Sequence, residues 1–168
     1  MKEASLLDIG GGIGALHHEL LEDVARTAVH VDSSSAYLKE ARAEAARRGH
    51  LERVTFLHSD FTDVTSDLQD ADIVTLDRVV CCYPDFRRLL TAAAGKTRRI
   101  LAMSYPRESW YFRLGLYMIN ALQRLRREPF RAFRHPVREM DQLLEVHGLY
   151  RASLHRLLVW EVAVYRRA

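Results

Sequence analysis

Three glycines in the segment LLDIGGGIGALHHELL, residues 6–21, are the first residues whose spacing points to binding chemistry. Gly10, Gly12 and Gly14 directly follow a short apolar segment and precede a helical pattern. Without side chains, the backbone of such a turn can bend sharply and approach a ligand closely. The free N–H groups at the start of the following helix favour an anionic or carboxylate group nearby. The pattern indicates a nucleotide-binding turn, although glycine-rich turns also form purely structural corners.

Carboxylates that follow three apolar segments have the chemistry to hold the rest of a nucleoside. Asp32 ends the segment AVHVD about twenty residues after the glycines, where an acid can accept from both hydroxyls of a ribose. Asp8 lies just before the glycines, where its charge would repel a pyrophosphate but suits an ammonium group. After the segment VTFLH, Asp60 can accept from an adenine amino group while the Phe61 ring packs beside it.

Alternating strand-like and helix-like segments must position these residues. Strands are predicted at about residues 5–9, 27–31, 54–57, 72–76 and 98–104. Helical patterns lie between them, one of which opens with the paired serines Ser34 and Ser35 and ends at Gly49, and a further helix is predicted at about 137–147. The alternation predicts a doubly wound, mostly parallel sheet. The C-terminal segment GLYRASLHRLLVWEVAVYRR has two β-rich parts without a helix between them, so we expect an antiparallel hairpin that closes the sheet.

Length and composition predict a single cytoplasmic domain. The 168 residues, 48% of them hydrophobic, provide enough apolar mass for one core. The two cysteines are adjacent and cannot build a disulfide framework, which fits a reducing compartment. We see no charged-then-apolar leader, and the longest nearly apolar run, residues 114–122, is too short to span a bilayer.

The formal charge of +3 is unevenly distributed, because arginines are concentrated in the last third of the chain. They are Arg124, Arg126, Arg127, Arg131, Arg134 and Arg138. A solvated helical face is the simplest interpretation. Contact with an acidic substrate or with RNA is the alternative.

A nicotinamide enzyme is one reading of the glycine turn, because Gly10, Gly12 and Ala15 fit the dinucleotide fingerprint. Three features disfavour it. Asp8 would repel a pyrophosphate, Asp60 is placed for an adenine, and the chain is too short for a separate substrate domain.

Taken together, the motifs resemble those of the class I S-adenosylmethionine-dependent methyltransferases over nearly the whole chain. LLDIGGGIG, VHVD, HSDF and ADIVTLDRVV match the first to fourth motifs of that family. The resemblance implies an α/β fold with a seven-stranded sheet whose last strand is antiparallel, in one domain over residues 1–168. It also implies S-adenosylmethionine as the cofactor.

The resemblance assigns cofactor-binding roles to particular residues. Asp8 and Gly10 would bind the methionine part, and Asp77 would close that end beside the transferable methyl group. The full set implied to bind the cofactor is Asp8, Gly10, Gly12, Gly14, Asp32, Asp60, Phe61 and Asp77.

Catalytic residues are harder to predict, because a sulfonium methyl group is already activated. Alignment of the reactants can lower the barrier by about 7–11 kcal/mol, and a base adds roughly 10²–10⁴-fold where the acceptor must lose a proton. The candidate bases are His17, His18, Tyr83, Tyr105 and His135, each of which also has a purely structural interpretation.

The fourth motif indicates which kind of atom accepts the methyl group. LDRVVCCYPD lacks the Asn-Pro-Pro-aromatic signature associated with methylation of exocyclic or amide nitrogens, which favours oxygen or carbon acceptors. Arg78 follows Asp77 where the metal-dependent catechol type has an Asp-Asn pair, so the resemblance implies no metal. The adjacent Cys81 and Cys82 are expected to face the core.

A substrate lid is predicted at about residues 105–135, where the family often inserts one. Trp110, Tyr111, Phe112 and Tyr117 precede the arginines there, which suits a small hydrophobic or aromatic acid. A core helix and a membrane-surface helix are the other interpretations.

Small-molecule methylation is therefore the predicted function, with two alternatives. One is an RNA methyltransferase. The other is a non-catalytic cofactor-binding module or partner subunit, because the chain begins only a few residues before the first strand and family members commonly carry N-terminal helices there.

Overall fold

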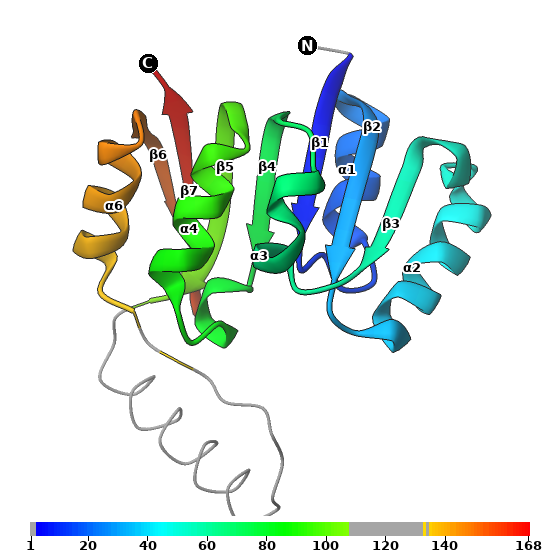
Figure 1. Ribbon diagram of the computed structural model, residues 1–168, viewed down its shortest axis with the longest axis horizontal. Coiled ribbons are helices and arrows are strands. Elements are labelled where there is room, and N and C mark those ends of the chain that lie inside the picture. Colours follow the sequence, from blue (N-terminus) through cyan, green and yellow to red (C-terminus); the bar gives the residue numbers. More distant parts are fainter. Residues whose placement is uncertain (1–2, 108–132, 134) are drawn as a thin grey trace, which may run out of the picture.

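One seven-stranded sheet organises the part of the chain that the computed structural model describes, residues 3–107, 133 and 135–168 (Figure 1). The strand order is β3-β2-β1-β4-β5-β7-β6. The strands are β1 (Ala4–Ile9), β2 (Ala25–Asp32), β3 (Val54–His58), β4 (Ala71–Asp77), β5 (Thr97–Pro106), β6 (Leu149–Arg156) and β7 (Trp160–Arg167). The helices are α1 (Ala15–Asp23), α2 (Ser35–Arg48), α3 (Phe61–Val64), α4 (Phe86–Gly95) and α6 (Val137–Val146).

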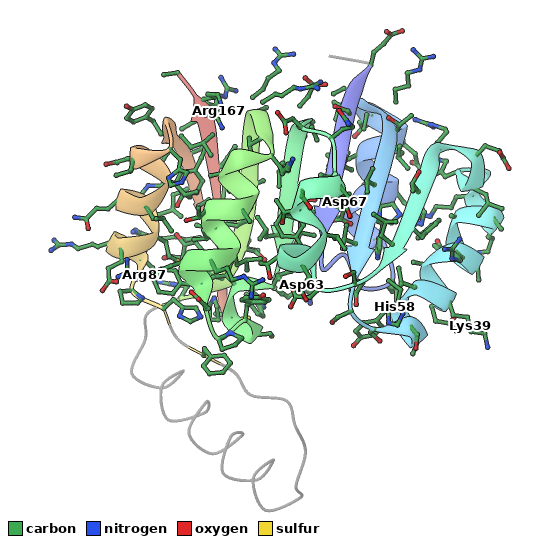
Figure 2. The ribbon with its side chains drawn as sticks, in the orientation of Figure 1. Lys39, His58, Asp63, Asp67, Arg87 and Arg167 are labelled. Carbon is green, nitrogen blue, oxygen red and sulfur yellow. The ribbon has the colours of Figure 1, made fainter. Side chains whose placement is uncertain are left out.

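Strand directions confirm the predicted fold class. β1 pairs in parallel with β2 and β4, and the pairs β2–β3 and β4–β5 are also parallel. β7 is antiparallel to both β5 and β6, as the terminal hairpin predicts. Figure 2 shows the consequence. Arg167, near the carboxyl end of β7, and His58, at the carboxyl end of β3, lie toward opposite ends of the strands. The carboxyl ends of the five parallel strands therefore share one edge.

Helices cover both faces of the sheet because apolar side chains alternate along the central strands. Leu7 of β1 packs in the cluster that contains α4 and α6, whereas the adjacent Leu6 packs in the cluster that contains α1 and α2. This two-sided burial explains why the strands read as apolar runs. The same burial fixes which way each strand faces in the sheet, and therefore where the residues after it are placed.

Helix α2 shows how local sequence sets the element boundaries. Ser34 caps its start by accepting from the Tyr37 N–H at 3.3 Å, and Gly49 ends it in the left-handed conformation, with φ +72°. The predicted helix from the paired serines to Gly49 is confirmed.

A buried tyrosine joins the terminal hairpin to α6. Tyr165 of β7 is fully buried, and its hydroxyl donates to Asp141 Oδ1 at 2.7 Å. Arg151 of β6 donates to the other oxygen of Asp141, also at 2.7 Å. Burial raises the pKa of Tyr165, and it raises the pKa of Tyr105 to about 12.

We expect Tyr165→Phe to lower the free energy of unfolding by about 1–2 kcal/mol, because Asp141 loses a buried donor. Urea denaturation at neutral pH measures this loss, with the exposed Tyr150→Phe of β6 as the control. Because the folded-state pKa is raised, the tyrosine contribution is complete below the unfolded pKa of about 10 and is lost as the pH rises above it. The variant should therefore lose less stability than the wild type above pH 10. An equal decline would contradict this assignment.

Two further observations concern the predicted lid and the membrane. The predicted lid at 105–135 lies almost entirely outside the described residues. Trp110, the other aromatic residues predicted there and most of the six arginines named above are also outside them. Among the residues that are described, no helix is both long enough and apolar enough to cross a bilayer.

Candidate functional site

A cleft of about 700 Å³ lies where the parallel strands end. Its lining comes largely from the carboxyl ends of the strands and the segments after β1, β2, β3 and β4, and includes Gly10, Asp32, Asp60 and Asp77. This is the edge at which open α/β sheets bind ligands, and the volume falls within the range of small-molecule sites, roughly 300–1,000 Å³. The sheet topology thus brings together residues that are far apart in the sequence.

The glycine turn between β1 and α1 forms one wall of the cleft. Gly10, Gly12 and Gly14 all have positive φ, at +62°, +58° and +86°. Gly10 N–H donates to the Val31 carbonyl at 2.7 Å, which ties the turn to β2. Gly14, which caps α1, does not line the cleft, whereas Gly10 and Gly12 do.

Gly11 meets a steric requirement that the sequence pattern did not reveal. A Cβ at this position would lie 2.2 Å from Asp8 Oδ2 and 2.8 Å from His30 Cε1. The turn is therefore pressed against buried polar side chains on its inner side, and only glycine fits there.

Asp32 joins the glycine turn to the start of α2. Its Oδ2 accepts from Gly12 N–H at 2.9 Å, and its Oδ1 accepts from Ser34 N–H at 2.8 Å. Each carboxylate oxygen can accept about two hydrogen bonds, so both retain capacity for a ligand. Asp32 is 7% exposed and lines the cleft, which leaves it pre-oriented by the backbone on both sides.

Asp60 and Phe61 line the cleft at the end of β3. Asp60 caps α3 by accepting from Thr62 N–H at 2.9 Å, and the Tyr83 hydroxyl donates to its two oxygens at 3.0 and 3.1 Å. Burial raises the pKa of Tyr83, which keeps this hydroxyl protonated as a donor. Among the five candidate bases, Tyr83 alone lines the cleft, and its hydroxyl is engaged with Asp60.

Asp77 ends β4 at the far side of the cleft. Ser104 Oγ of β5 donates to its Oδ1, and Arg78 Nε donates to its Oδ2 at 3.2 Å. Arg78 has φ +59°, a left-handed conformation that costs a non-glycine residue about 1–2 kcal/mol. Its N–H donates to Ser104 Oγ at 2.8 Å, so one serine holds both residues in place.

Asp8 lines the cleft from beneath Gly11, but both its oxygens are engaged in the interior. Thr75 Oγ1 donates to Oδ1 at 2.7 Å, and His17 Nδ1 lies 3.0 Å from Oδ2. His17 and His18 are fully buried under the turn, and burial lowers the pKa of His18 to about 4. The structure therefore does not bring either histidine to the cleft.

The remaining candidate bases lie together elsewhere. Tyr105 and His135 line a small cavity with Phe133 and Met140, and His135 Nε2 lies 2.9 Å from the Tyr83 carbonyl oxygen. Neither residue lines the main cleft.

The cysteine pair is split between interior and surface, which corrects part of the sequence-based expectation. Cys81 is buried, as expected, but Cys82, the next residue of the short turn Val80–Cys82 after β4, is exposed and lines the cleft, with the two sulfurs 3.6 Å apart.

Two residues that the sequence pattern did not predict contribute to the site, because each holds one of its carboxylates in place. Ser34 supplies a backbone donor to Asp32, and Thr75 holds Asp8. The serines after Asp32 were visible as a helix start, but a serine cap gives no sign of a carboxylate partner. Thr75 lies within an apolar strand run, where only the register with β1 makes it a neighbour of Asp8.

Comparison with protein families gives a match over more than half of the chain. The family described as "Methyltransferase domain" matches residues 6–101, which include most of β1, all of β2 to β4 and the cleft-lining segments after them. No curated protein matches the sequence significantly.

Solved structures with the same fold include several methyltransferases. Magnesium protoporphyrin IX methyltransferase from Synechocystis PCC 6803, with bound S-adenosylhomocysteine, is 20% identical at a TM-score of 0.77, over 97% of this chain and 73% of that one. An O-methyltransferase family protein from Burkholderia thailandensis is 17% identical at a TM-score of 0.80, over 99% of this chain and 52% of that one. An O-methyltransferase family 2 protein from Planctomyces limnophilus, in complex with apigenin, is 16% identical at a TM-score of 0.76, over 99% and 50%. The chain thus spans about half the length of the latter two, and the likeness concerns the fold.

Proposed function

Because this chain belongs to the methyltransferase-domain family, we propose that it is a class I S-adenosylmethionine-dependent methyltransferase acting on a small molecule. The observation that carries the proposal is Asp32: its carboxylate faces the cleft and is held there by Gly12 N–H and Ser34 N–H. An acid fixed in this way beside a glycine turn is suited to a ribose.

The described residues fit an adenosyl amino acid. Asp32 would accept from the ribose hydroxyls, and Asp60 with Phe61 would hold the adenine. Gly10 and Gly12 would let the backbone approach the methionine part, and Asp77 would lie at that end. Bound there, S-adenosylmethionine would supply an activated methyl group.

Two of the predicted cofactor residues act from behind the cleft in this proposal. Asp8 would support the turn through Gly11, because its oxygens are bonded to Thr75 and lie against His17. Gly14 would let the chain enter α1, since its positive φ is required there and it does not line the cleft.

We infer an oxygen or carbon acceptor of small size, and positioning as the chain's main catalytic contribution. The segment after Asp77 lacks the signature associated with methylation of exocyclic or amide nitrogens. Four of the five candidate bases do not line the cleft, and the hydroxyl of the fifth, Tyr83, is engaged with Asp60. The solved O-methyltransferase-family structures, one of them in complex with apigenin, support a search among phenols and carboxylic acids first.

Calorimetry and a transfer assay test the two parts of the proposal separately. We expect S-adenosylhomocysteine to bind the chain saturably in isothermal titration. We also expect radiolabelled methyl transfer from S-adenosylmethionine to at least one member of a panel of phenols and aromatic or aliphatic carboxylic acids. No binding to the folded chain would overturn the cofactor assignment. Binding without transfer would favour a non-catalytic module, and transfer to tRNA alone would favour an RNA methyltransferase.

A further inference from the structure

Four of the eight histidines are buried together beneath the glycine turn, beside Asp8. Asp8, His17, His18 and His30 are fully buried, and His50 is 7% exposed. Polar side chains are rarely buried unless something compensates for the water they lose. This cluster is not explained by the packing of an apolar core, and the proposed cofactor chemistry does not use its histidines.

Three ligand-type atoms of the cluster converge on one point. His17 Nδ1 lies 3.0 Å from Asp8 Oδ2 and 3.0 Å from His30 Nδ1, and His30 Nδ1 lies 3.8 Å from Asp8 Oδ2. Around a tetrahedral ion with bonds of about 2.0–2.1 Å, ligand atoms lie about 3.3–3.4 Å apart. The three separations bracket that value, so one ion at bonding distance from all three atoms requires almost no movement.

Hydrogen bonds within the cluster do not account for this convergence. His17 Nδ1 carries at most one proton, yet it faces both Asp8 Oδ2 and His30 Nδ1. The Asp8 carboxylate is also fully buried, and an ionised carboxylate in such a place requires a positive partner. A cation at the convergence point supplies that charge.

We propose that Asp8, His17 and His30 bind a divalent transition metal ion, with zinc the best match, in the interior beneath the glycine turn. Two imidazole nitrogens and one carboxylate oxygen form a recurrent zinc ligand set. The ligands come from β1, α1 and β2, so the ion joins the three elements that carry the turn. A water molecule would complete a tetrahedral shell, since no other described histidine, cysteine or acid belongs to this group.

Thr75 would support the ligand Asp8 in this site. Its hydroxyl donates to Asp8 Oδ1 at 2.7 Å, which leaves Oδ2 directed at the two histidines. Partners of this kind fix the orientation of a ligating carboxylate, and their loss typically lowers metal affinity about 10–100-fold.

Cobalt titration of the untagged full chain tests the proposal. After treatment with a chelator, the folded wild type is expected to bind Co²⁺ stoichiometrically, with the visible absorption of a tetrahedral ion, and Zn²⁺ is expected to displace it. His30→Gln removes one ligand and should weaken Co²⁺ binding by at least about 100-fold, more than the loss of a supporting partner. Thr75→Val should weaken it about 10-fold or more.

Matched controls separate metal ligation from burial. His18→Gln changes an equally buried histidine of α1 outside the three ligands, and His58→Gln changes an exposed one at the end of β3. Both are expected to retain wild-type Co²⁺ affinity. If His30→Gln does not fold, X-ray absorption of the zinc-loaded wild type replaces it, with two imidazole nitrogens in the shell as the expected result.

Three results would overturn the site: a folded wild type that takes up no stoichiometric Co²⁺ or Zn²⁺, unchanged affinity in His30→Gln, or a zinc shell without imidazole. None of these measurements uses S-adenosylmethionine, so a failure of the metal site can be distinguished from a failure of the proposed function.

Discussion

Asp32→Ala is expected to weaken S-adenosylhomocysteine binding by about 100-fold. In the proposed complex its carboxylate accepts from both ribose hydroxyls, and each such charge-assisted hydrogen bond contributes roughly 1.5–3 kcal/mol. Loss of about 3 kcal/mol corresponds to about two orders of magnitude in Kd. The substitution also removes the acceptor that Gly12 N–H and Ser34 N–H use, so the turn loses its tie to α2. Isothermal titration calorimetry measures the change.

Two variants sharpen this measurement. Asp32→Asn keeps one carbonyl acceptor and the side-chain size, so it should lie between the wild type and the alanine variant. Asp67→Ala removes an exposed acid outside the cleft and should bind like the wild type. Circular dichroism must show that all three variants are folded. Wild-type affinity in a folded Asp32→Ala would remove the central support for the proposed function.

The fold could be predicted from the sequence because each local signal agreed with the global arrangement. Apolar runs marked strands β1 to β5 to within about two residues at each end. The serine pair and Gly49 marked both ends of α2. Alternation of strands and helices then required parallel pairs, and two β-rich segments without a helix required the antiparallel hairpin.

The cleft-lining acids were predictable for the same topological reason. Asp32 and Asp77 each end a parallel strand and Asp60 follows one, and the sheet brings the carboxyl ends of such strands to one edge. Their neighbours were not predictable. His30 lies two residues before Asp32 in an apolar strand, and only the pairing of Asp8 with His30 across β1 and β2 reveals that they are neighbours.

The sequence also could not predict that the two histidines of α1 are directed toward the interior. His17 and His18 lie three and four residues after Gly14, and a helical pattern alone does not say which face of α1 meets the sheet. The structure buries His17, His18 and Leu21 and leaves Leu16 and Leu20 only partly buried. The turn enters α1 at Gly14, whose left-handed conformation sets the rotation of the first helical turn toward the interior.

Gly14→Ala is therefore expected to be far more destabilising than Gly12→Ala, although both glycines have positive φ. A Cβ at Gly14 would lie 2.4 Å from His17 Cε1, and that ring is fully buried and cannot swing away. A Cβ at Gly12 would meet nothing within 4 Å. Left-handed strain costs about 1–2 kcal/mol at either position, and overpacking adds about 1–3 kcal/mol at Gly14 alone.

Urea denaturation followed by circular dichroism measures both variants, with Gly12→Ala as the matched control for backbone strain. We expect a loss of about 1–2 kcal/mol at Gly12 and about 2–5 kcal/mol at Gly14. Zinc in excess should not rescue Gly14→Ala, because the added methyl group overlaps the ring of His17, one of the proposed zinc ligands. Equal losses at the two glycines would mean that His17 does not pack under the turn. Both the buried cluster and the explanation of how α1 is oriented would then have to be abandoned.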